Sequence, residues 1–122
     1  MHLTARELDV MAGLWDRGSA TVGEVLDELK DDLAYTTVLT VLRGLEAKGA
    51  VRHEQDGRAF RYLPRIKPTR IGNRSLKRLV DKVYSGSRER LVTQLVADRN
   101  ISTDELKRIR QLIDERIREA DQ

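Results

Sequence analysis

The stretch AYTTVLTVLRGLEAKGAVRHEQDGRAFRY, residues 34–62, decides the fold expected for this chain. Its first half places apolar residues at i, i+3, i+4 and i+7, namely Val38, Val41, Leu42 and Leu45. This spacing predicts an amphipathic helix over residues 35–48 whose apolar side faces a core.

The second half predicts a β-hairpin directly after that helix. Gly49 can adopt the left-handed conformation that ends a helix, and β-prone segments at residues 50–55 and 58–63 flank Asp56-Gly57. Asp-Gly between two such segments is the strongest short hairpin signal. The arms are basic, with Arg52, Arg58 and Arg61. A helix followed by a basic hairpin is the order of a recognition helix and wing in a winged helix-turn-helix domain.

The polar side of the predicted helix carries no acidic residue. It holds Thr36, Thr40, Arg43 and Ala47, flanked by Thr37, Leu39 and Gly44, and no Asp or Glu occurs between residues 33 and 45. In a chain that is 35% charged this is informative, because Glu and Lys are better helix formers than Thr. We expect this side to lie against a polyanion, to which it presents hydroxyls, methyls and one guanidinium.

The composition indicates a small, mainly helical protein. With 122 residues the chain can form one compact domain and an appendage. It has no cysteine, which excludes disulfides and cysteine-based catalysis or metal binding. No apolar run approaches the ~20 residues that span a bilayer, and the charges within residues 1–12 do not fit a signal peptide. We expect a cytoplasmic protein without membrane insertion.

Charge is sorted along the chain. Residues 1–32 contain three basic and eight acidic residues, a net charge of −5, whereas residues 43–81 contain eleven basic and four acidic residues, a net charge of +7. A basic middle segment is the electrostatic footprint of a nucleic-acid binder. A basic surface that merely faces solvent is the competing interpretation.

Three capping boxes mark helix starts, at residues 4–7, 21–24 and 102–105. The first helix should end at Gly18 and bury Leu8, Met11, Ala12 and Trp15, although Trp15 could instead stack on a ligand. The second helix should bury Val22, Val25, Leu26 and Leu29. Because its outer side is acidic, it should support the next helix rather than enter a DNA groove. Residues 31–34 would form the turn between the two.

Pro64 and Pro68 bracket a hinge, so we expect a DNA-binding domain over residues 1–66 and a helical unit over residues 67–122. The second unit should contain three amphipathic helices that cannot close a core alone. Their apolar stripes predict dimerisation of two copies through Leu76, Leu79, Val80, Val83, Leu91, Val92, Leu95, Leu106, Ile109, Ile113 and Ile117. The alternative is that all three helices fold back on the first domain.

These residues resemble the BlaI/MecI penicillinase-repressor family over nearly the whole chain. The resemblance rests on Leu33 to Leu42, Leu45 to Gly49, Asp56 to Arg58, Phe60 to Tyr62, and the start from Leu3 to Trp15. It implies a homodimeric winged-helix repressor that binds an inverted-repeat operator and is released when a membrane sensor with a metalloprotease domain triggers its cleavage. With the basic arms, it implies DNA contacts by Tyr35, Thr36, Thr37, Leu39, Thr40, Arg43, Arg52, Arg58 and Arg61.

Two departures from the family pattern bear on these expectations. Staphylococcal members place basic residues where Leu39 and Gly44 stand, which bears on the operator sequence. The family's inactivating cut falls between Asn and Phe, at positions that match Gln94 and Leu95, so cleavage control is not assumed. Copper-responsive relatives use cysteines, which this chain lacks.

The sequence therefore predicts a dimeric, sequence-specific DNA-binding repressor, with residues 35–48 in the major groove and the wing, residues 51–63, on the backbone. The alternative is a winged-helix module that binds protein through the Thr-rich side. An enzyme is disfavoured, because no nucleophile with a base, phosphate loop or metal-ligand spacing occurs. His53 is expected to be a half-exposed strand residue rather than a metal ligand. We expect no cofactor and no metal.

Overall fold

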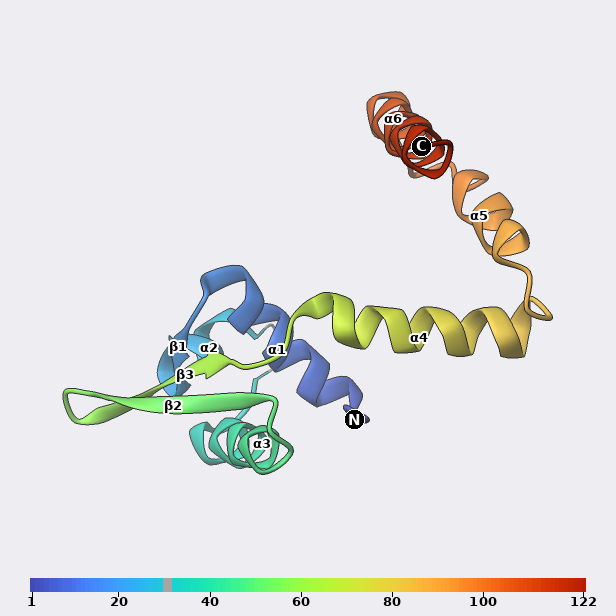
Figure 1. The fold of residues 1–122 in the computed structure, drawn as a ribbon. Coiled ribbons are helices and arrows are strands. Elements are labelled where there is room, and N and C mark those ends of the chain that lie inside the picture. The colour runs from blue at the N-terminus through green and yellow to red at the C-terminus, as the bar shows by residue number, and fades with distance from the viewer. Residues whose placement is uncertain (30–31) are drawn as a thin grey trace. The chain divides into compact units, whose positions relative to one another are not determined.

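The computed structural model describes residues 1–29 and 32–122 (Figure 1). The expected turn over residues 31–34 therefore begins outside the described residues. The element order is α1 (Ala5–Arg17), β1 (Ala20–Thr21), α2 (Val22–Glu28), α3 (Tyr35–Ala47), β2 (Val51–Asp56), β3 (Ala59–Pro64), α4 (Pro68–Val83), α5 (Arg88–Val96) and α6 (Thr103–Ala120). This order confirms the expected winged helix-turn-helix domain followed by helices.

The predicted caps set the helix starts. Thr4 and Thr21 each accept a hydrogen bond from the amide three residues on, and Glu7 and Glu24 return the second bond of the box. The α1 helix ends at Gly18, which has a φ of 84°. In α6, Ser102 accepts from the amide of Glu105, one of the two bonds expected of a capping box.

The sheet has three antiparallel strands in the order β1-β3-β2. The hairpin runs from Val51↔Pro64 to Asp56↔Ala59, so both strands lie one residue further along than the sequence predicted. Its loop is Gly57-Arg58, and the φ of 63° at Gly57 is the value that a type II′ turn requires at its first loop position. Strand β1 was not predicted, because its two residues are too few to show an alternating pattern.

The core of the first unit forms where α1, α2 and α3 meet the sheet. Its fully buried side chains include Val10, Met11, Leu14, Val38, Leu42, Leu45, Val51 and Tyr62. The buried side of α1 differs from the prediction, because Leu8 is exposed and Val10 and Leu14 are buried instead. Residues 7, 10, 11 and 14 have the same helical spacing as residues 8, 11, 12 and 15. The true set includes a glutamate, which hid it from a search for apolar residues.

Trp15 confirms the core interpretation and also fixes the chain after the wing. Its ring packs against the core, and its Nε1 donates a hydrogen bond of 2.9 Å to the carbonyl of Ile66. Ile66 is buried. This bond holds the segment after β3 against α1.

Glu7 joins the start of α1 to the end of α3. Only 7% of the residue is exposed, and its Oε1 accepts from the Lys48 ammonium at 2.6 Å and from the Thr4 amide at 2.9 Å. Burial raises the pKa of this carboxyl, but the bonds from Lys48 and Thr4 outweigh it, so the pKa lies below its ordinary value. The recognition helix is therefore held at its last turn.

The chain divides into two compact units, Met1–Arg74 and Ser75–Gln122. The expected division lay at residues 66 and 67, before α4, whereas the compact units divide within α4. Ile71 packs against the core of the first unit, and Arg74 donates to the carbonyl of Met1 at 3.0 Å. The first turns of α4 are thus part of the winged-helix unit.

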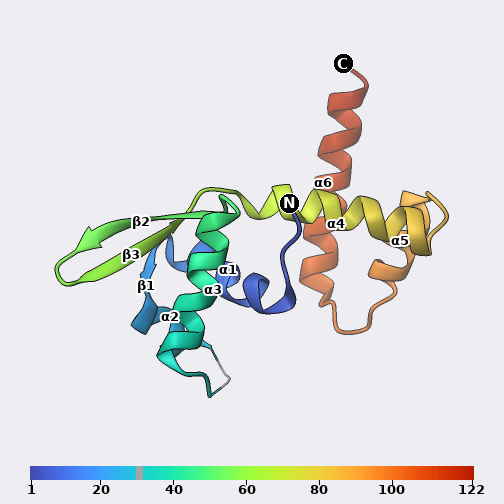
Figure 2. The same ribbon diagram turned by 90° about the horizontal axis from the view of Figure 1, so that it is seen from below.

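The second unit, taken by itself, leaves most of its predicted apolar stripes exposed. Val80 is buried, and Leu91 and Ile109 are half-buried. The exposed large apolar residues are Leu76, Leu79, Val83, Val92, Leu95, Val96, Leu106, Leu112, Ile113 and Ile117. Figure 2 shows α6 as an extended rod. Within the described part of the chain, no helix has both the length and the apolar character needed to cross a lipid bilayer.

Glu7→Gln should lower the free energy of unfolding by about 1.5–3 kcal/mol near neutral pH, because it removes a buried charge-assisted bond. The folded-state pKa of Glu7 is lowered, so this stability is present above the ordinary pKa and is lost as pH falls through the folded-state value. Urea unfolding at about pH 7 and about pH 3 measures both effects.

Asp27→Asn, an exposed change on α2, is the matched control and should leave the unfolding free energy within about 0.5 kcal/mol of the wild type. Equal stability of Glu7→Gln and the wild type at neutral pH would contradict the role given to Glu7.

Candidate nucleic-acid interface

The exposed side of α3 matches the side predicted to meet a polyanion. Val38, Leu42 and Leu45 are fully buried, which turns the opposite side to solvent. That side carries Tyr35, Thr36, Thr37, Thr40, Arg43 and Ala47, all of them exposed. The acidic residue of the helix, Glu46, lies at its edge and binds His53 on β2. The surface of α3 is therefore polar, small and free of carboxylates.

Leu39 and Gly44 lie at the two edges of this exposed side. Leu39 is half-buried and packs against the core. Gly44 is half-buried on the other edge, where an added Cβ would lie 3.8 Å from Oε2 of Glu7. Of the α3 residues predicted to touch DNA, Leu39 is thus the one that the structure places partly inside the fold.

The hydroxyl of Thr40 is occupied within the helix. It donates a hydrogen bond of 2.9 Å to the carbonyl of Thr36 one turn earlier, a bond that Ser and Thr commonly make in helices. With this proton engaged, Thr40 offers its methyl group and the hydroxyl oxygen. Its surface suits an apolar contact, such as one with a thymine methyl group.

The start of α3 differs chemically from the starts of α1, α2, α5 and α6. Those four helices have a Ser or Thr cap and at least one acidic residue in the first turn. The N-cap of α3 is Ala34, which has no side-chain bond to offer, and the first turn of α3 has no acidic residue. Its first amide groups therefore remain available to an anion.

The three wing arginines fall into two groups. Arg58 is the second residue of the two-residue loop and is exposed. Arg52 binds Glu54 at 2.7 Å within its own strand. Arg61 binds Asp56 at 2.9 Å and Glu24 at 3.0 Å. The charges of Arg52 and Arg61 are thus paired with carboxylates, whereas Arg58 stands at the end of the hairpin that projects from the unit (Figure 1).

The strand register explains this division. Residues paired across an antiparallel ladder share a side of the sheet, so His53 and Tyr62 lie on one side, and Glu54 and Arg61 on the other. The first side faces α3, because Glu46 of that helix contacts His53 and Tyr62 is buried. Arg61 points away from α3. The sequence had no signal for this, because the basic arms alternate between the two sides.

The hydrogen bond from Asp56 raises the pKa of the Arg61 guanidinium above its ordinary value, and Glu24 adds to the rise. Glu24 also binds Arg17 of α1, which reaches Glu28 at 2.8 Å. Sequence reasoning missed this ion-pair chain, Arg17, Glu24, Glu28, Asp56 and Arg61. Its members come from α1, α2 and the hairpin, so no fixed spacing could reveal it.

His53 lies where the strand interpretation placed it. It is half-exposed, its Nδ1 is 2.5 Å from Oε2 of Glu46, and its ring centroid is 4.5 Å from that of Phe60. Among the described residues, no group of three or more His, Cys, Asp or Glu side chains could hold a metal ion.

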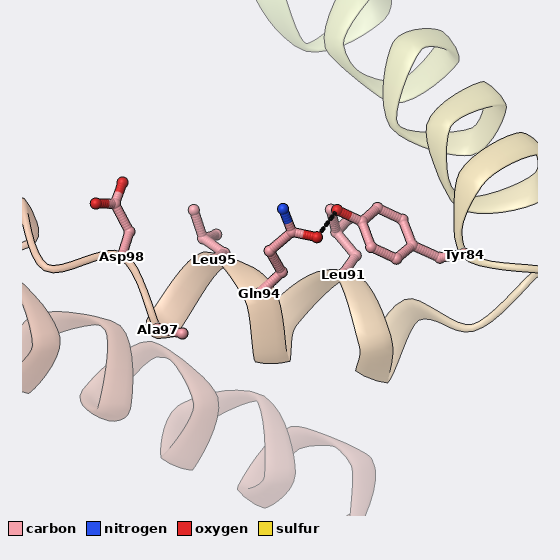
Figure 3. A pocket seen from close by; sticks show the side chains of 6 residues that line it. All are labelled: Tyr84, Leu91, Gln94, Leu95, Ala97 and Asp98. Atoms are coloured by element: carbon pink, nitrogen blue, oxygen red, sulfur yellow. Dashed lines mark hydrogen bonds between the residues drawn. The ribbon is translucent and has the colours of Figure 1, made fainter.

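Gln94 and Leu95, which match the cut site of the resembling family, lie on α5. Oε1 of Gln94 accepts a hydrogen bond of 2.5 Å from the hydroxyl of Tyr84. Figure 3 shows both residues beside a hollow whose lining also includes Leu91, Ala97 and Asp98. The bond between Gln94 and Leu95 is thus helical.

Comparison with known proteins identifies the family. Residues 3–115 match the family model described as penicillinase repressor. The chain is 34% identical to "Transcriptional regulator BlaI" of Mycobacterium tuberculosis (strain CDC 1551 / Oshkosh), over 89% of this chain and 80% of that one. It is 28% identical to "Penicillinase repressor" of Bacillus licheniformis, over 93% and 91%.

A solved structure of a relative matches the winged-helix unit. It is the monomeric form of Bacillus licheniformis BlaI in complex with the blaP half-operator, with a TM-score of 0.50 and 34% identity over 57% of this chain and 87% of that one. The relatives are named as repressors and regulators rather than enzymes. On its fold and on the match along residues 3–115, the chain belongs to the penicillinase repressor family.

Proposed function

We propose that the chain is a dimeric DNA-binding transcriptional repressor whose α3 helix enters the major groove of an inverted-repeat operator. The observation that carries this proposal is the exposed side of α3, which is free of carboxylates and bears an arginine. Such a side can lie within a groove lined by phosphates without repulsion. The half-operator complex of the Bacillus licheniformis relative supports DNA as the partner.

Within the groove, Arg43 and the threonines supply two kinds of contact. Arg43 is exposed, and a guanidinium bonds most often to O6 and N7 of guanine. Thr40, with its hydroxyl proton engaged by Thr36, presents a methyl group that suits thymine. Tyr35, Thr36 and Thr37 lie in the first turn, where the uncapped amides can bond a phosphate.

On the backbone, Arg58 is the wing residue that we assign to phosphate. It stands in the loop of the hairpin, whereas Arg52 is paired with Glu54. A phosphate contact adds affinity without sequence preference and makes binding fall with salt. Repression would follow from occupation of a promoter.

The second unit supplies dimerisation. Eight of the eleven predicted interface residues are exposed in a single copy, including Leu76, Val83, Ile113 and Ile117. Exposed apolar area of this kind is stabilised by burial at about 25 cal/mol per Å², and a second copy offers matching stripes. Two linked winged-helix units then read two half-sites. Because Gln94-Leu95 replaces the Asn-Phe pair, release by that cleavage through a membrane metalloprotease sensor is not part of the proposal.

The rival function is a winged-helix module that binds protein through the Thr-rich side of α3. Salt separates the two, because DNA binding that neutralises several phosphates weakens steeply as salt rises. A mobility-shift titration of the wild type on the promoter of its own gene at two salt concentrations tests the proposal. Binding that is absent, or indifferent to both salt and sequence, would contradict it.

Arg43→Ala should weaken binding by about 1–3 kcal/mol on the preferred duplex and should relax selectivity at one base-pair position, because a base-edge contact is lost. Titration against duplexes with single base-pair changes measures it. An equal loss on every duplex would instead place Arg43 on a phosphate.

Arg58→Ala should weaken binding to all duplexes alike and reduce the salt slope by about 1, because one phosphate contact is lost. Arg52→Ala is the matched control on the same hairpin and should change the slope less, since Arg52 is paired with Glu54. An unchanged slope for Arg58→Ala would remove the wing from the interface.

Ile113→Glu should convert the dimer to a monomer, because it places a charge in the exposed apolar stripe of α6. Sedimentation equilibrium measures the mass, and binding to a full inverted repeat should weaken more than binding to one half-site. Gln111→Glu adds the same charge on the opposite side of α6 and should leave the dimer intact. Dissociation by both variants alike would contradict this interface.

A further inference from the structure

Arg61 is held at three points, two of them on other elements of the fold. Its Nε donates to Oδ2 of Asp56 at 2.9 Å, at the end of β2 beside the hairpin loop. Its Nη1 lies 3.0 Å from Oε1 of Glu24, in the first turn of α2, and donates to Oγ of Ser19 at 3.3 Å. The guanidinium thus connects the hairpin to the helix-turn-helix.

The α2 end of this connection is itself fixed. Oε1 of Glu24 accepts from the amide of Thr21, and this backbone bond, with Arg17 and Arg61 nearby, lowers the pKa of the Glu24 carboxyl. Arg17 of α1 binds both Glu24 and Glu28. The ion-pair chain therefore runs from α1 through α2 to the hairpin, and each end is anchored in a different element.

The charge of this ion-pair chain does not suit a phosphate. It contains two arginines and three carboxylates, Glu24, Glu28 and Asp56, so its net charge is −1. Arg61 also lies on the side of the sheet that faces away from α3. A DNA backbone that reached Arg61 would meet Asp56 and Glu24 at the same place.

We propose that Arg61 is a positioning residue for DNA binding: by bridging Asp56 and Glu24, it sets the angle of the hairpin and so places the loop residue Arg58 on the phosphate backbone. The hairpin needs such a support, because beyond Tyr62 both strands are exposed up to the loop except for Arg61 itself. The proposal rests on the DNA-binding function proposed above.

This role predicts a sign opposite to that of simple electrostatics. Asp56 immediately precedes the Gly57-Arg58 loop, so its charge should repel a nearby phosphate, and removing that charge would strengthen binding if charge were all that mattered. If Asp56 instead holds Arg61, then removing its charge loosens the hairpin. Asp56→Asn should therefore weaken DNA binding although it makes the wing more positive.

The experiment compares Asp56→Asn with Glu54→Gln in the full-length chain. Both variants remove one negative charge from the same strand, and both side chains are about half exposed, 50% for Asp56 and 54% for Glu54. Glu54 binds Arg52 within β2 and bridges no elements. Affinities are measured by fluorescence anisotropy on a mixed-sequence DNA duplex, because the wing contact is to phosphates, and on the promoter duplex.

Asp56→Asn should weaken binding to both duplexes by about two- to five-fold, the range that one exposed ion pair supports. Glu54→Gln should leave binding unchanged or strengthen it. Arg61→Lys keeps the charge but loses the planar fork that bonds two carboxylates, so it should weaken binding by a similar factor while the salt slope stays that of the wild type. Amide exchange should quicken in β2 and β3 and stay unchanged in α1.

Asp56→Asn binding as tightly as the wild type or tighter would overturn the proposal. So would Arg61→Ala with a salt slope reduced by about 1, since that would mark a direct phosphate contact. The proposed function fails in a different way, namely when the wild type itself shows no salt-dependent DNA binding. Wild-type binding together with strengthened binding by Asp56→Asn would therefore sink this inference alone.

Discussion

The packing of α3 between α1 and the sheet is the constraint on which the site depends. Val38, Leu42 and Leu45 are wholly removed from solvent, and each such side chain stabilises the fold by about 1.5–3 kcal/mol. A helix with three buried positions at this spacing has no freedom to rotate about its axis. The burial of one side therefore decides which residues face outward, and the Thr-rich side becomes a fixed surface rather than one of several.

Polar contacts fix the ends of the same helix. Lys48, just after its last turn, reaches the buried carboxylate of Glu7 on α1, and Glu46 reaches His53 on β2. The two contacts lie on opposite edges of α3 and lead to different elements. The apolar core sets the rotation of the helix, whereas these bonds hold its C-terminal end between α1 and the hairpin.

The sequence predicted what periodicity and local chemistry can reveal. The helices, the caps at Thr4 and Thr21, the hairpin and the exposed side of α3 all follow from patterns within a few residues. The buried side of α1 was mispredicted, because Glu7 occupies an inward position and is neutralised by Lys48, 41 residues away. Strand β1 was missed because two residues show no period.

The wing shows most clearly where sequence reasoning ended. Three arginines on two basic arms were equivalent in the sequence, yet the register places Arg61 against Asp56 and Glu24 and leaves Arg58 in the loop. Pairing partners that come from different elements cannot be found from spacing. The role of each candidate DNA contact, in contrast to its position, remains a proposal tested by binding experiments.

The exposed apolar stripes of the second unit couple assembly to the amount of protein in the cell. When a fold is completed by a second copy, its stability rises with protomer concentration. While most chains are single, the number of paired chains grows as the square of the total. A promoter governed in this way would respond to small changes in repressor synthesis more sharply than one bound by independent monomers, and dilution at cell division would by itself loosen control.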